Sequence, residues 1–147
     1  MTQEPVFPHI MLVDDDRVTN RLHRRLIEKA GLAGRLTKAL DGPAALALLR
    51  AALDAGQRLP DVIFLDINMP RGGGFVFLEG YAMLPSAPNV PRLVAMLSSA
   101  LLPEERGRAI AHPHVSEACA RPLTAEWLGD FARRHGAAAK PGRPRYS

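Results

Sequence analysis

Short apolar runs alternate with amphipathic stretches along most of the chain. Continuous apolar runs of this length suit the strands of a parallel sheet that is covered on both faces. The expected strands are His9–Val13, Leu36–Leu40, Val62–Asp66, Leu93–Leu97 and Val115–Ala120. Because a helical pattern follows each of these five runs, their order predicts a doubly wound α/β sandwich with a five-stranded parallel sheet.

The first expected helix follows residue 16 and has an apolar spacing of four residues. Val18, Leu22, Leu26 and Ala30 recur at this interval, and this spacing predicts that they face the core. Four arginines are left for the other faces of the helix: Arg17, Arg21, Arg24 and Arg25.

The remaining helices are placed by caps and breakers. They are expected to run from Asp41 to about Gly56, from about Gly74 to Leu84, from Pro103 onward and from Thr124 onward. In the last of these helices, Leu128 and Phe131 are the residues expected to pack inward.

Length and composition fit a single globular domain, since the chain has 147 residues, of which 47% are hydrophobic and 23% are charged. The longest apolar stretch, Ala44–Leu49, is far shorter than the roughly 20 residues that span a bilayer. The start of the chain shows no secretory signal. Cys119 is the single cysteine, which excludes an internal disulfide and a multi-cysteine zinc site. The expected location is the cytoplasm.

Charge is distributed unevenly along the chain. The net charge is +4, yet the residues after position 132 contain basic side chains and no acid. The predicted organisation is an N-terminal extension (1–7), one folded domain (8–135) and a basic tail rich in Gly, Ala and Pro (136–147). A disordered, solvated terminus is the expectation for this tail, with contact to an acidic partner or to phosphates as the alternative.

Reactive side chains follow four of the expected strands: Asp14–Asp16, Asp66, Ser98–Ser99 and Arg121, in chain order. In a parallel sheet of this kind the binding crevice lies beyond the carboxyl ends of the strands. Two carboxylates about 4 Å apart repel by about 4 kcal/mol at an effective dielectric constant of about 20, so three of them require a cation. Oxygen ligands with room for water and phosphate predict Mg²⁺, with Mn²⁺ as the alternative.

These motifs resemble the receiver domain of two-component response regulators, of the single-domain, chemotaxis-receiver type. They are Leu12–Asp16 followed by Asn20, Ala39–Leu46, Asp61–Pro70 with Gly74, Met96–Ser99 and Arg121–Thr124. The resemblance covers about residues 8–135, and five motifs in the same order and spacing make it specific. It implies a flavodoxin-like (βα)5 fold.

The resemblance also implies the role of each site residue. Asp66 would accept a phosphoryl group from a phosphohistidine and become an aspartyl phosphate. Asp15 and Asp66 would bind Mg²⁺ directly, together with the backbone carbonyl of Asn68, and Asp14 would act on the ion directly or through water. The Ser98 hydroxyl and Arg121 would contact the phosphoryl oxygens, which is the arrangement of donors that phosphoryl transfer needs.

The sequence departs from the family pattern at three positions. Arg121 stands where the family has lysine, Ala118 stands where an aromatic residue is common, and Gly73 replaces an acid. Ala118, in the switch region, excludes the familiar swing of an aromatic ring. The guanidinium fork of Arg121 is expected to neutralise charge. It could also clamp Asp66 and compete with Mg²⁺.

Three further residues have expected structural roles. Asp16 is expected to cap the first helix. Cys119, inside an apolar run, is expected to be a buried small hydrophobe. Trp127 is expected to pack the last helix against the sheet or against a partner.

The leading hypothesis is a stand-alone receiver that takes part in a Mg-dependent phosphorelay. Its expected partners are a sensor histidine kinase or a histidine phosphotransfer protein, which the arginines of the first helix would help to bind, and a downstream protein. Readout would use local loop and helix movement or a homodimer. No DNA-binding domain, membrane segment or turnover activity is expected.

Two alternatives remain open. The chain could be a degenerate receiver, a phosphorylation-independent interaction module in which Arg121 occupies the phosphoryl position. The segment Ile10–Val18 also resembles the start of haloacid-dehalogenase-like phosphohydrolases, with Asp14 as the nucleophile and Asp16 as the acid. That reading leaves the segment Asp66–Pro70 without a role.

Overall fold

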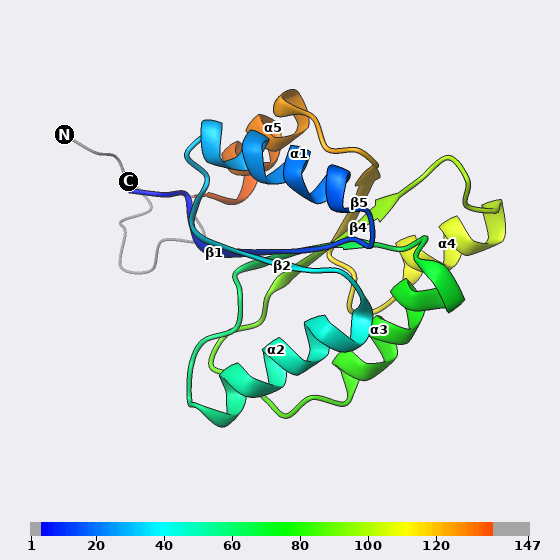
Figure 1. The fold of residues 1–147 in the computed structure, drawn as a ribbon, viewed down its shortest axis with the longest axis horizontal. Helices are drawn as coiled ribbons and strands as arrows, with labels where there is room; N and C mark the ends of the chain where they lie inside the picture. The colour runs from blue at the N-terminus through cyan, green and yellow to red at the C-terminus, as the bar shows by residue number, and fades with distance from the viewer. Residues whose placement is uncertain (1–3, 137–147) are drawn as a thin grey trace.

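The computed structural model describes residues 4–136 of the chain (Figure 1). The predicted tail therefore lies outside the described residues, apart from Gly136, as do residues 1–3 of the predicted extension. The elements are β1 (Phe7–Val13), α1 (Arg17–Lys29), β2 (Ala33–Ala39), α2 (Gly42–Asp54), β3 (Val62–Asp66), the short 3₁₀ helix η1 (Pro70–Gly72), α3 (Gly73–Ala82), β4 (Arg92–Leu97), α4 (Pro103–Ala111), β5 (Glu117–Ala120) and α5 (Ala125–His135).

The strands form one parallel sheet in the order β2-β1-β3-β4-β5. Figure 1 shows α1 and α5 together on one face, with α2, α3 and α4 on the other side. This confirms the predicted doubly wound, flavodoxin-like sandwich. The order makes β1 and β3 neighbours, with Val13 opposite Leu65, so the segments that follow these two strands emerge side by side.

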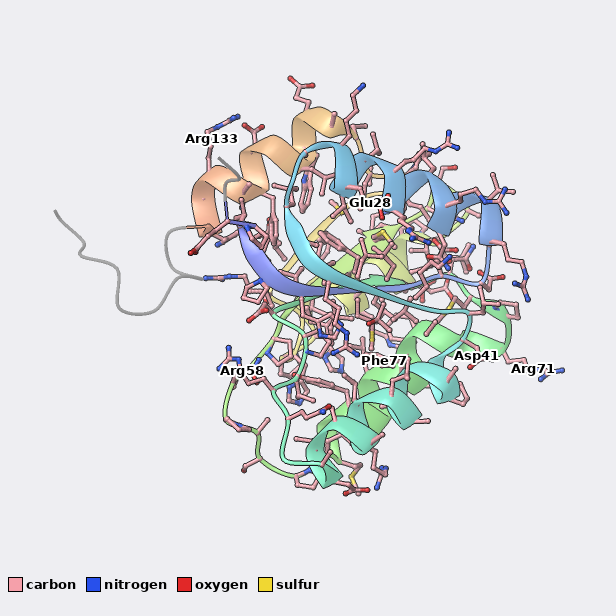
Figure 2. The ribbon with its side chains drawn as sticks, turned by 60° about the vertical axis from the view of Figure 1, so that its left-hand side comes forward. Glu28, Asp41, Arg58, Arg71, Phe77 and Arg133 are labelled. Carbon is pink, nitrogen blue, oxygen red and sulfur yellow. The ribbon has the colours of Figure 1, made fainter. Side chains whose placement is uncertain are left out.

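Each face of the sheet has its own apolar core. On the α2 and α3 side, Phe77 is fully buried and points toward the sheet in Figure 2, next to Leu49 and Ile63. On the α1 and α5 side, Phe64 and Phe131 are fully buried with their ring centroids 5.8 Å apart. Continuous apolar strands follow from this double coverage, because both faces of each central strand are removed from water.

The boundaries of β1 and of the two edge strands, β2 and β5, differ from the predictions. β1 begins at Phe7, two residues before the expected start, and the Phe7 ring is buried against Phe131. β2 begins at Ala33 and β5 is limited to Glu117–Ala120. Partly polar strands at the edges of a sheet have only one paired neighbour, so apolar runs mark their ends poorly.

The prediction for the inward face of α1 was wrong at three of its four positions, and only Leu26 is partly buried against the core. Val18 is 68% exposed and Leu22 is 44% exposed. The residues that face the sheet are Asn20, His23 and Ile27. A strict spacing of four residues turns about 40° too far at each step of a helix with 3.6 residues per turn, so an apolar stripe of that spacing moves away from the sheet. The predicted exposure of the four arginines is confirmed.

The predicted packing of α5 is confirmed. Leu128 and Phe131 are its buried residues, and the Thr124 hydroxyl caps its N-terminus by accepting a hydrogen bond from the Trp127 N–H at 3.1 Å. The Trp127 ring stacks on Phe131 at 5.1 Å and meets Phe64 edge-on at 6.0 Å. Cys119 is buried beneath this helix, as expected. No helix within residues 4–136 has the length and apolar character needed to cross a bilayer.

Candidate functional site

The carboxyl ends of the central strands meet at one open hollow of about 590 Å³. Asp66 is the last residue of β3, and Arg121 directly follows β5. The hollow is lined by Asp15, Asp16, Asp66, Asn68, Ser98, Ser99, Ala100 and Arg121. The structure thus brings together five of the predicted site residues, as the position of the strand ends required. They are Asp15, Asp66, Asn68, Ser98 and Arg121.

Three carboxyl groups form the acidic part of the site. Oxygens of Asp14, Asp15 and Asp66 all lie within 4.8 Å of one another. Asp14 has no exposed surface and Asp66 has 2%, whereas Asp15 is exposed. Carboxylates this close repel strongly unless a cation lies among them. An all-oxygen donor set with an open side fits a hard divalent cation such as Mg²⁺.

Asp66 lies in an environment that disfavours its charge. Burial, followed by the neighbouring charge of Asp14, raises the pKa of Asp66 to about 7. Arg121 and the hydrogen bond from the Asn68 N–H, 3.0 Å from Asp66 Oδ1, act in the opposite direction. Asp66 Oδ2 has an ion-pair contact with Arg121 Nε at 3.7 Å. A further cation would therefore favour the ionised form of Asp66.

Arg121 binds Asp14 more closely than Asp66. Its Nε donates to Asp14 Oδ2 at 2.9 Å, and its Nη2 donates to Asp14 Oδ1 at 3.2 Å. The same Nη2 donates to the Thr19 hydroxyl at 3.0 Å and lies 3.6 Å from Asp16 Oδ2. The sequence indicated Asp66 as the partner of this fork, but the shortest contacts are with Asp14.

The loops that bear Asp14 and Arg121 are both attached to α1. Asn20 Nδ2 donates to the backbone carbonyl of Asp14 at 2.9 Å, and His23 Nε2 accepts from the Leu123 N–H at 2.9 Å. Sequence analysis quoted Asn20 within a motif and missed His23. The i, i+3 spacing of these two residues was the available signal, because it places them on one face of a helix.

Asp16 has the capping role expected for it. Its side chain accepts from the backbone N–H groups of Val18 and Thr19, at 2.9 and 3.4 Å, and from the Thr19 hydroxyl at 2.9 Å. These hydrogen bonds cap the N-terminus of α1, so the helix begins at Arg17, two residues after Asp15. The cap therefore fixes the turn that bears the acidic residues.

Ser98 also lines the hollow, and its hydroxyl oxygen already accepts hydrogen bonds. Asn68 Nδ2 donates to Ser98 Oγ at 3.3 Å, and the Ala100 N–H donates at 3.2 Å. The hydroxyl hydrogen is therefore left to donate toward a ligand. Ala118 does not line the hollow; it packs partly buried against the core on the α2 and α3 side.

The loop after Asn68 turns sharply around small residues. A Cβ atom on Gly74 would lie 2.5 Å from the Cα atom and the carbonyl oxygen of Ile67, so only glycine fits there. Arg71 has a positive φ of 59°, and Figure 2 shows its side chain extending outward from this loop. The close approach of α3 to the end of β3 keeps this loop beside Asp66.

Comparisons with known proteins agree with this geometry. Residues 10–110 match the model of the response regulator receiver domain. The chain is 30% identical over 123 residues to the probable methanogenesis regulatory protein FilR2 of Methanothrix harundinacea, covering 81% of this chain and 75% of that protein.

Two solved structures are also similar to the chain. A two component response regulator from Cytophaga hutchinsonii has a TM-score of 0.74 and 26% identity, covering 92% of this chain and 99% of that one. A response regulator receiver protein from Dyadobacter fermentans has a TM-score of 0.71 and 30% identity, covering 86% and 95%. The fold, the acidic site and the family match together show that this chain belongs to the response regulator receiver domains of two-component signalling.

Proposed function

We propose that the chain accepts a phosphoryl group on Asp66 and signals through protein contact. The position of Asp66 is the observation that supports this most directly. It ends the central strand β3 in the hollow that Ser98 also lines, and oxygens of Asp14 and Asp15 lie within 4.8 Å of one of its own. The donor in this proposal is a phosphohistidine of a sensor histidine kinase or of a histidine phosphotransfer protein.

The transfer forms one bond and breaks one bond. Asp66 Oδ1 is held by the Asn68 N–H, so we assign the attack to Oδ2. This oxygen forms a bond to phosphorus while the phosphorus–nitrogen bond of the phosphohistidine breaks, and the electron pair of that bond stays on the departing imidazole. The Ser98 O–H, free to donate, would bind a phosphoryl oxygen, and the Arg121 guanidinium would neutralise negative charge.

The residues that would hold Mg²⁺ are Asp14, Asp15, Asp66 and the backbone carbonyl of Asn68. When bound, the ion would offset the negative charge that gathers on the phosphoryl oxygens during transfer. The close approach of the three carboxylates and the raised pKa of Asp66 support a cation at this position. Mn²⁺ has the same oxygen preference and is the alternative metal.

Two observations argue against the phosphohydrolase alternative. Asp14, the nucleophile in that reading, has no exposed surface, and Arg121 binds both of its carboxylate oxygens. Asp16, the proposed acid, is engaged in capping α1. The degenerate module has one observation in its favour, namely that the Arg121 guanidinium already lies among the acidic residues.

The proposed signalling mode is that of a stand-alone receiver in the cytoplasm. Ala118 cannot supply an aromatic switch, so the phosphorylated state would be recognised through loop and helix movement or through a homodimer. The protein would act as a phosphoryl acceptor with a downstream protein partner, not as a turnover enzyme.

Labelling with acetyl phosphate and Mg²⁺ tests the proposal. We expect mass spectrometry to find one phosphoryl group on Asp66, none in Asp66→Asn, and less in Asp14→Asn because its metal affinity is reduced. Asp54→Asn, on the exposed end of α2, is the control and should label like the parent chain. Labelling that persists without Asp66 but is lost without Asp14 would support the hydrolase. No labelling, even by cognate kinases, would support the degenerate module.

A further inference from the structure

Arg121 and Asp14 form a bidentate ion pair. Two parallel N–H···O hydrogen bonds join them, at 2.9 and 3.2 Å. Asp14 Oδ1 accepts a further hydrogen bond from the Asp16 N–H at 2.9 Å. A bidentate pair of this kind has a defined geometry and is stronger than a single-point contact. Neither oxygen of Asp14 is free of a donor in this arrangement.

Arg121 also separates Asp14 from the hollow. Asp15, Asp66 and Arg121 all line the hollow, but Asp14 does not. The Arg121 side chain is 21% exposed and the Asp14 side chain is fully covered. An ion that enters the hollow would therefore meet the guanidinium before it meets the Asp14 carboxylate.

Two residues outside the expected metal ligands hold the guanidinium in place. The Thr19 hydroxyl accepts from Arg121 Nη2 at 3.0 Å and donates to Asp16 Oδ2 at 2.9 Å. Asp16 Oδ2 itself lies 3.6 Å from Arg121 Nη2. The Thr19 hydroxyl thus links Arg121 to Asp16, the capping residue of α1, by two hydrogen bonds. The guanidinium is therefore held by Thr19 as well as by Asp14.

We propose that Arg121 is an internal cation that competes with the divalent metal for Asp14, so that the metal binds only when the guanidinium leaves this carboxylate. The inference rests on the metal site of the proposed function, and it adds a residue of this chain that sets the affinity of that site. A lysine would present a single point charge on a flexible stem, whereas arginine presents a planar fork that matches a carboxylate. The identity of residue 121 therefore determines the affinity of the site for the divalent metal.

Isothermal titration calorimetry of the full chain with Mg²⁺, and separately with Mn²⁺, tests the competition without any phosphodonor. We expect Arg121→Lys to bind Mg²⁺ about tenfold more tightly than the parent chain, a change of about 1.4 kcal/mol. Thr19→Val removes one support of the fork and should tighten binding about threefold. Thr19→Ser retains the hydroxyl and should restore the affinity of the parent.

Arg17→Gln is the charge control, because Arg17 is exposed beside Asp16 and no hydrogen bond or ion pair joins its side chain to a described residue. It removes one positive charge near the site without touching the fork, and its Mg²⁺ affinity should stay within about twofold of the parent. Tightening in Arg17→Gln as large as that in Arg121→Lys would show that the Mg²⁺ affinity does not depend on the Arg121 fork, and it would overturn the proposal. Unchanged affinity in Arg121→Lys would overturn it as well.

The outcome is separable from that of the proposed function. Tighter Mg²⁺ binding by Arg121→Lys in a chain that never labels on Asp66 would retain the competition and reject the phosphoryl acceptor. Labelling of Asp66 with equal Mg²⁺ affinity in both chains would retain the acceptor and reject the competition.

Discussion

Helices α1 and α5 cover the same face of the sheet, yet they contact it with different chemistry. The buried residues of α5 are Leu128 and Phe131, and its neighbours in the core are aromatic rings. Two of the buried residues of α1 are polar, Asn20 and His23. Side-chain burial stabilises the fold at α5, whereas at α1 directed hydrogen bonds attach the two loops that bear Asp14 and Arg121.

The difference shows that one layer of helices can serve two purposes. α5 contributes apolar surface, and burial of such surface stabilises the fold without requiring a particular side-chain direction. α1 supplies donors and acceptors, which require particular positions. We therefore expect substitutions in α5 to lower the stability of the whole domain, and substitutions on the inward face of α1 to alter the site more than the core.

Phe131→Ala should have the largest effect on stability. The ring is fully buried and contacts Phe7, Phe64 and Trp127. Its removal should lower the free energy of unfolding by about 3–5 kcal/mol, as for other buried aromatic residues. Urea unfolding followed by circular dichroism measures this. A loss below about 1 kcal/mol would contradict the aromatic core described for α5.

The pH dependence of stability should distinguish the polar face of α1 from α5. Burial lowers the pKa of His23 to about 4, although the charge of Asp14 acts against this. The unfolded chain then binds a proton that the folded chain does not, so the contribution of His23 is complete above about pH 6.5 and is lost as the pH falls toward about 4.

Asp66 gives the stability of the fold the opposite pH dependence, over nearly the same pH range. Its raised pKa of about 7 means that its contribution is lost as the pH rises from about 4 to 7. In EDTA, the free energy of unfolding of Asp66→Asn should therefore rise more steeply with pH than that of the parent. Between about pH 4 and 6.5 the difference between the two increases should reach up to about 3 kcal/mol. Urea midpoints across this range measure the slopes, and parallel slopes would contradict the raised pKa of Asp66.

His23→Leu should have a smaller and more local effect. It leaves the Leu123 N–H without its acceptor, which costs about 1–3 kcal/mol for a buried group. It also removes the buried His23 Nδ1, which has no partner in the described part of the chain, and this removal partly offsets the cost. Hydrogen exchange should show faster exchange at the Leu123 amide than the global change explains. Phe131→Ala is the control, since it should accelerate exchange without selecting this amide.

Val18→Gln should have the smallest effect. The side chain is 68% exposed, and exposed substitutions usually change stability by less than about 0.5 kcal/mol. The four-residue apolar spacing predicted a core position, for which the loss would be several times larger. Urea unfolding of this variant thus tests directly which face of α1 contacts the sheet.

The fold and the acidic residues could be predicted because each depends on local sequence. Buried parallel strands are continuous apolar runs, and the topology of such sheets places their ends at one crevice. The face of α1 could not be predicted in this way, because Asn20 and His23 are buried only through partners that lie elsewhere in the chain. The pairing of Arg121 with Asp14 also depends on the conformations of two loops, and residue types alone do not specify these.

The separation of the site residues along the chain has a consequence for assembly. Asp14 and Arg121 are 107 positions apart, and the strands that precede them are joined only through β3 and β4. The hollow therefore exists only when nearly the whole sheet has formed, and no local segment can form it alone. A ligand bound there would stabilise the domain as one unit, by about 2.7 kcal/mol at a free concentration of about 100 times its dissociation constant. Occupancy of the hollow would thus be linked to the global folding equilibrium of the domain.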